Sequence, residues 1–120
     1  MNLSQIIKTL VSEIKLTEIQ AKIFLHVVIN GKMSTSKISN DLKISLDDAT
    51  QNSKKLVELG GFIDMPNDEF EAMHPRFTAV NMYRKMCERE QKEFKKNLNV
   101  DNIGVALEVS YDDARTKYNK

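Results

Sequence analysis

The side chains best suited to bind another molecule lie on one face of a helix predicted near the middle of the chain. The helical period turns Gln51, Lys54 and Lys55 outward and leaves Thr50 at the border of that face. A glutamine amide can pair with adenine, and a lysine can contact guanine or a phosphate. The same helix opens with Asp47–Asp48, which either accepts from a cytosine amino group or forms a solvated acidic turn that repels phosphates.

Hydroxyl groups at two predicted helix starts could add contacts to phosphates. Thr35, Ser36 and Lys37 open a short helix, and Ser45 caps the helix that carries Gln51. Hydroxyls in such positions can hold a DNA phosphate together with the backbone N–H groups behind them. Since any helix start favours the same residues, this pattern alone does not separate DNA binding from ordinary capping.

The sequence contains no recognisable set of catalytic or metal-binding residues. It has no phosphate-binding glycine loop, no H-x-x-x-H and no C-x-x-C. His26 and His74 are far apart in the sequence, and His26 is expected to pack beside the apolar stripe of its helix rather than bind a metal. The single cysteine, Cys87, can form no intrachain disulfide. We therefore predict a protein that is not an enzyme and that uses no cofactor or metal.

Three predicted helices and two predicted strands position the candidate residues. The first helix is capped by Thr17 and ends at Gly31, and the third ends on a pair of glycines. Between the first two helices, Met33–Thr35 can form a short strand. After the third helix, the strands Phe62–Asp64 and Glu69–Met73 are joined by a Pro-Asn-Asp turn.

Four stretches between Leu16 and Met73 carry a family resemblance: LTEIQAKIF, STSKISNDL, LVELGGFID and FEAM. Together they cover about half of the chain and resemble the DNA-binding domain of the archaeal TrmB-type transcriptional regulators. The resemblance implies a winged helix-turn-helix whose third helix reads bases in the major groove. The chain departs from the family at Asp47–Asp48, where the family tends to carry arginine or serine, and at the wing tip, which is acidic instead of basic. Full-length members of the family also carry a sugar-binding domain, and we expect none within these 120 residues.

Two amphipathic segments flank this domain. Residues 1–15 predict a helix that either extends the core or contacts a second subunit, and its apolar stripe is Leu3, Ile6, Ile7, Leu10, Val11 and Ile14. Residues 76–98 predict one long helix with a near-heptad stripe, interrupted at Glu90, that is typical of dimerisation. That stripe consists of Val80, Tyr83, Cys87, Phe94 and Leu98. A reduced, buried thiol is expected for Cys87.

The last segment, residues 99–120, predicts a short helical tail. Its apolar run, Ile103–Val109, is expected to pack back on the long helix or on a partner, with Ser110 capping a last turn or two. The predicted fold is thus mainly α. It comprises a winged helix-turn-helix domain over residues 16–75, with a small two- to three-stranded antiparallel wing, and a long C-terminal dimerisation helix.

Charge is distributed unevenly along the chain. Residues 1–75 carry a net −2, residues 76–98 a net +4 and residues 99–120 a net −1. A DNA-binding face normally presents a basic patch, and the expected reading face has only a weak one. A cytoplasmic location is expected, since no apolar run is long enough to span a bilayer and the N-terminus does not resemble a signal peptide.

Two functions fit these observations. In the first, a homodimer binds double-stranded DNA in a sequence-specific way and regulates transcription. In the second, which the acidic turn and wing favour, the winged helix binds another protein of the transcription machinery. The residues expected to contact DNA are Thr35, Ser36, Lys37, Ser45, Thr50, Gln51, Lys54 and Lys55.

Overall fold

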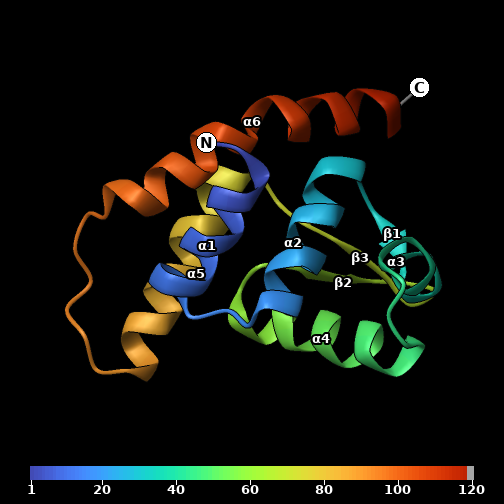
Figure 1. Ribbon diagram of the computed structural model, residues 1–120, viewed down its shortest axis with the longest axis horizontal. Helices are drawn as coiled ribbons and strands as arrows, with labels where there is room; N and C mark the ends of the chain where they lie inside the picture. The colour runs from blue at the N-terminus through green and yellow to red at the C-terminus, as the bar shows by residue number, and fades with distance from the viewer. Residues whose placement is uncertain (119–120) are drawn as a thin grey trace.

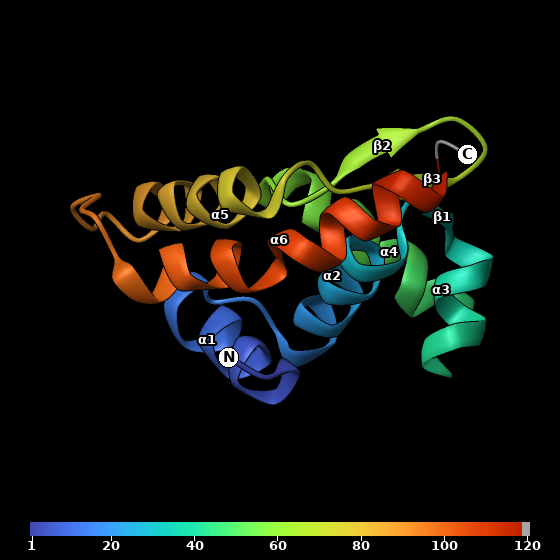
Figure 2. The same ribbon diagram turned by 90° about the horizontal axis from the view of Figure 1, so that it is seen from above.

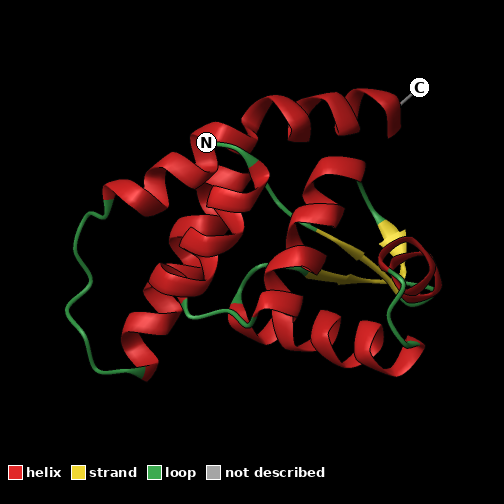
Figure 3. Ribbon diagram, in the orientation of Figure 1, coloured by secondary structure: helices red, strands yellow, loops and turns green. Residues whose placement is uncertain are grey.

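The computed structural model describes residues 1–118, which form six helices and a small three-stranded antiparallel sheet (Figures 1 and 3). The prediction of a mainly α fold with a small antiparallel sheet is confirmed, and the order of its elements is compatible with a winged helix. No helix within residues 1–118 is both long enough and apolar enough to cross a membrane. The elements are α1 (Leu3–Ile14), α2 (Glu18–Asn30), β1 (Met33–Ser34), α3 (Thr35–Leu42), α4 (Leu46–Leu59), β2 (Ile63–Met65), β3 (Glu69–Glu71), α5 (Pro75–Arg89) and α6 (Leu98–Tyr118).

The sheet has the strand order β1-β3-β2, with β3 in the centre. Phe70 on β3 lies opposite Met33 on one side and Asp64 on the other. The turn between β2 and β3 places Asn67 and Asp68 in the left-handed region, at φ 66° and 57°. Asparagine and aspartate tolerate that conformation better than other residues with a side chain, which explains the turn at this point.

Three aromatic rings join the sheet to the helices. The ring of Phe62 lies 6.1 Å from that of Phe24 on α2 and 6.0 Å from that of Phe70 on β3. All three side chains are buried. Rings at these separations add an aromatic attraction to their large buried area, so they fix the sheet against α2.

The N-terminal helix packs into the core of its own chain. A capping box at Asn2 starts α1, and its inward residues Ile6, Leu10 and Ile14 are at most 2% exposed. These three side chains belong to the same core as α2 and α6. The apolar stripe of α1 therefore extends the core of its own chain, which is one of the two roles predicted for it.

The predicted continuous helix over residues 76–98 is wrong. Helix α5 ends at Arg89, and Gln91 turns into the left-handed region at φ 54°. The backbone N–H of Lys92 donates to the carbonyl of Cys87 at 2.9 Å, and that of Gln91 to Glu88 at 3.4 Å. This pair of bonds is a Schellman motif, which satisfies the last carbonyls of a helix and stops it. It forms here with Gln91 in place of the usual glycine, so no residue type in the sequence marked the end of the helix.

The prediction of a short C-terminal tail capped by Ser110 is also wrong. Residues Leu98–Tyr118 form one helix, α6, and Ser110 lies inside it. The side chain of Asn97 starts this helix by accepting from the backbone N–H groups of Asn99 and Val100, at 3.0 and 3.3 Å. Its buried residues, spaced by helical turns, are Val100, Ile103, Gly104, Leu107 and Ala114. Seen from above, α6 runs beside α5 and across α2 (Figure 2).

Candidate nucleic-acid interface

Helix α4 lies along the edge of the molecule opposite α6 (Figure 1). Ala49, Ser53 and Leu56 are completely buried, as the helical period predicts. The opposite face is exposed and carries the predicted polar residues Gln51, Lys54 and Lys55, with Thr50 partly buried at its border. Leu46, in the first turn of the helix, is 53% exposed.

The polar residues of α4 are partly engaged with carboxylates of the same helix. The amide of Gln51 donates to both carboxylate oxygens of Asp47, each at 3.0 Å. The ammonium of Lys55 lies 3.1 Å from the carboxylate of Glu58. Among the described residues, Lys54 forms no ion pair. Gln51 would therefore have to leave Asp47 before it could offer its amide N–H group to a base.

The hydroxyl groups at the helix starts divide into capping and exposed ones. Ser34 is the N-cap of α3 and accepts from the backbone N–H of Lys37 at 3.2 Å, while Ser45 caps α4 and accepts from Asp48 at 3.0 Å. Thr35 is only 6% exposed, which leaves Ser36 as the exposed hydroxyl at the start of α3. Of the predicted hydroxyl donors, Ser36 and Ser45 are exposed, and Ser36 is the one that does not cap a helix.

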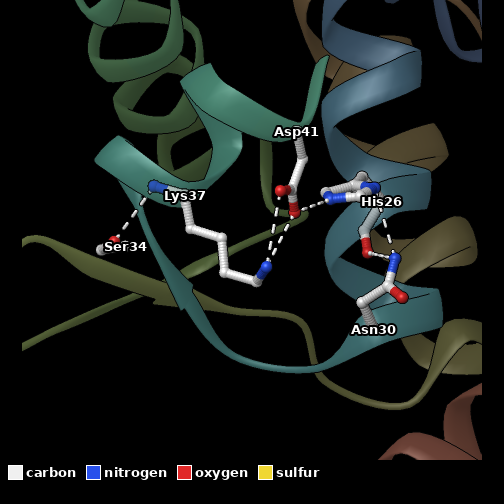
Figure 4. A network of polar contacts seen from close by, with 5 residues as sticks. All are labelled: His26, Asn30, Ser34, Lys37 and Asp41. Carbon is white, nitrogen blue, oxygen red and sulfur yellow. Dashed lines mark hydrogen bonds and ion pairs between the residues drawn. The ribbon is translucent and has the colours of Figure 1, made fainter. Parts of the chain in front are cut away.

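A polar network holds α3 against α2 (Figure 4). Asp41 Oδ2 lies 2.8 Å from His26 Nε2 and 3.1 Å from Lys37 Nζ. On the other side of the ring, the amide nitrogen of Asn30 lies 3.2 Å from His26 Nδ1. Lys37, expected at a phosphate, therefore already has a carboxylate partner. Sequence analysis missed this network because 15 residues separate His26 from Asp41, although the i,i+4 spacing of Lys37 and Asp41 was visible.

Replacing Asp41 by asparagine is expected to change how stability depends on pH. The contacts with His26 and then with Lys37 hold the pKa of Asp41 below its usual value. A carboxyl group with a lower pKa in the folded state stabilises that state above about pH 4, and this contribution disappears as the pH falls through the folded pKa. Urea unfolding at a series of pH values should therefore show a smaller loss on acidification for Asp41→Asn than for wild type. The effect is small, because the side chain is 30% exposed.

The control for this experiment is Asp64→Asn, an exposed aspartate outside the network. It should follow the wild-type acid dependence. If the free energy of unfolding fell equally for Asp41→Asn and wild type on acidification, the network would not couple the two helices.

The turn between β2 and β3 is acidic and lies close to α3. The backbone N–H of Thr35 donates to the carbonyl of Asp68 at 3.1 Å, which joins the turn to the start of α3. No lysine or arginine occurs between residues 56 and 75, whereas this stretch contains five carboxylates. A basic residue that could enter the minor groove from this turn is therefore absent from the sequence.

The five residues predicted at a dimer interface are not on one continuous face. Cys87 is buried, and Val80 and Tyr83 are partly buried against the chain's own core. The loop after α5 folds back, so that the ring of Phe94 lies 5.9 Å from that of Tyr83. Only Phe94 and Leu98 remain exposed. A dimerisation role for these five residues stays a prediction.

The structure thus gathers part of the predicted DNA-binding set on one exposed surface. Gln51, Lys54 and Lys55 share the outer face of α4, while Thr35 is largely withdrawn and Lys37 is paired with Asp41. The resemblance to a regulator family stays a prediction. Comparison with known protein families, curated proteins and solved structures finds no match for this chain.

Proposed function

We propose that this protein is a sequence-specific DNA-binding transcriptional regulator that acts as a homodimer. In this proposal the segment from α2 to β3 is a winged helix-turn-helix of the TrmB type, and α4 is its reading helix. The observation that carries the proposal is the outer face of α4, which is exposed and presents an amide and two ammonium groups, Gln51, Lys54 and Lys55. Contacts of a glutamine amide with adenine and of a lysine ammonium with guanine require these groups on the outer face of a helix that enters the major groove.

The charges around α4 define what kind of DNA binding is expected. Asp47 and Asp48 open α4, and Asp68 and Glu69 lie in the β2–β3 turn and at the start of β3. These carboxylates flank the expected contact surface and repel phosphates. Non-specific affinity should therefore be low and its dependence on salt shallow, because few phosphates are neutralised. A regulator of this kind would depend on base contacts more than on the phosphate backbone.

A second function, a protein-interaction module within the transcription machinery, is favoured by a specific observation. The carboxylate of Asp47 already binds the amide of Gln51, and the β2–β3 turn carries acids in place of basic residues. Such a surface suits a partner protein with a basic patch better than it suits DNA.

Binding to DNA separates the two functions. The experiment is a mobility shift with a pool of random-sequence duplexes, at low and at near-physiological salt, followed by sequencing of the bound fraction. A regulator should retain some duplexes at low salt and enrich a common sequence. Complete absence of a shift at low salt would reject DNA binding and leave the protein-interaction function.

A further inference from the structure

The outer face of α6 carries an exposed apolar stripe that none of the described residues covers. Leu98, Val105 and Val109 are 66%, 51% and 70% exposed, although all three are apolar. The inner face of the same helix is made by different residues, among them Ile103 and Leu107, which are completely or almost completely buried. Figure 1 shows α6 along the upper edge of the molecule, and in Figure 2, seen from above, no other element lies in front of it.

The outer face has the spacing of a coiled-coil seam. Its residues follow one another at alternating steps of four and three, the repeat that keeps one stripe of a helix against a partner helix. We call this set the α6 seam: Leu98, Asn102, Val105, Val109, Asp112 and Thr116. All six residues are exposed.

We propose that the α6 seam binds a second copy of this chain, with the two α6 helices antiparallel. This inference deepens the homodimer of the proposed function and rests on it for its biological role. In the antiparallel register, Val105 meets Val109 of the second copy at the centre. Asn102 then meets Asp112 of the second copy, to which its amide can donate, and Leu98 meets Thr116 of the second copy.

A parallel pairing lacks this complementarity. It would place the two Asp112 carboxylates against each other at a seam position, where like charges repel in a partly dehydrated contact. It would also leave each Asn102 facing its own copy instead of a carboxylate. The polar residues of the seam therefore select the antiparallel direction, as single polar residues do in other coiled coils.

Charges beside the α6 seam agree with the antiparallel direction. Asp101 of one copy comes beside Arg115 of the other, at two places related by the twofold axis. Both groups also have partners within their own chain, since Arg115 lies 3.1 Å from Glu71 and Asp101 lies 3.7 Å from Lys96, so the contacts across the dimer are shared ones. The two Glu108 side chains come close to that axis. Each is neutralised within its own chain, because Glu108 lies 3.0 Å from the guanidinium of Arg76 and 3.5 Å from His74 Nε2. Arg115 is held in place on the face of α6 by Tyr111, whose hydroxyl accepts from Arg115 Nε at 2.8 Å.

The size of the contact sets the expected strength of the dimer. A helix of this length extends about 30 Å and offers a contact one helix wide. Such a contact is smaller than the roughly 800 Å² per partner of a standard stable interface. We therefore expect a reversible dimer whose population rises over the micromolar range of protein concentration.

Sedimentation velocity over a dilution series, from about 1 to about 300 µM so as to bracket weak association, tests the pairing. Wild type should shift from monomer to dimer, and Val105→Glu with Val109→Glu should stay monomeric throughout. Both positions are more than half exposed, so the variant should keep the wild-type circular dichroism and thermal unfolding. The matched control is Leu3→Glu with Val11→Glu, two exposed apolar residues on the outer side of α1, which should still dimerise. A monomeric wild type at the highest concentration, or a dimeric Val105→Glu/Val109→Glu variant, would overturn the proposal.

Disulfide cross-linking tests the direction of the helices. In a Cys87→Ser background, Leu98→Cys and Thr116→Cys are made separately, oxidised alone and oxidised as a mixture. The antiparallel register predicts cross-linked dimers in the mixture and none in either protein alone. Cross-linking of each protein with itself would show a parallel pairing and overturn the register. DNA binding is measured separately, so a dimer that binds no duplex would reject the regulator and leave the α6 pairing intact.

Discussion

Replacing Lys54 and Lys55 together by alanine is expected to weaken binding to any duplex on the order of a hundredfold at low salt. Both ammonium groups lie on the outer face of α4, and each that neutralises a phosphate contributes about 0.9 to the slope of log affinity against log salt. The slope should therefore fall by about 1.8 per protomer. Lys55 must exchange its contact with Glu58 for a phosphate, which is a small cost for an exposed ion pair. Fluorescence anisotropy with a labelled duplex at several salt concentrations measures both quantities.

Removing the carboxylates at the start of the same helix is expected to have the opposite effect on DNA affinity. Asp47→Asn with Asp48→Asn should raise affinity for any DNA, because phosphate repulsion is relieved at the start of α4. The control is Glu90→Gln with Glu93→Gln, which removes the same charge from exposed positions in the loop after α5. It should bind as wild type does. Equal binding by wild type and by the double lysine variant would show that α4 is not the reading helix.

Replacing Gly104 by alanine is expected to lower the free energy of unfolding by about 1–3 kcal/mol, the usual cost of overpacking. A Cβ atom at this position would lie 2.6 Å from Cα of Arg76, a backbone atom of α5 that no rotamer change can move. The two helices would have to separate where they now touch. On an exposed helix face, replacing glycine by alanine would raise the free energy of unfolding by up to about 1 kcal/mol. The close approach to α5 therefore turns an expected stabilisation into a destabilisation. Urea unfolding followed by circular dichroism measures the difference.

An alanine elsewhere on α6 separates the close approach from helix propensity. Asp113 is exposed on the same helix, and Asp113→Ala should leave the unfolding midpoint unchanged or raise it slightly. A midpoint for Gly104→Ala at or above that of wild type would mean that α5 and α6 are not in contact at this glycine.

The features that could be predicted from the sequence are those set by local chemistry. Thr17 and Ser45 cap the helices that they were expected to cap, and Asn67 and Asp68 turn the chain between two strands. The face of α4 that carries Gln51 follows from the helical period alone. These residues act through their own backbone or through neighbours within one helical turn.

The features that could not be predicted depend on partners far along the chain. Gln91 ends α5 in a conformation that usually needs glycine, and the loop that follows is held by the contact of Phe94 with Tyr83. Gly104 is the point at which two long helices meet, and the residue that it touches, Arg76, lies 28 positions earlier in the chain. Which apolar residues of α6 are buried and which are exposed depends on its packing against α5 and α2, and these contacts are distant in the sequence.

The opposite placement of α4 and α6 determines the geometry of any complex with two duplexes. The molecule measures 29 Å along the direction that separates these helices in Figure 1. Two copies joined through α6 would hold their α4 helices about two such lengths apart and facing away from each other. Adjacent half-sites on one straight duplex are about 34 Å apart and need both helices on the same side. Such a dimer would instead bridge separate DNA segments, closing a loop between distant sites on one molecule or tethering two molecules together.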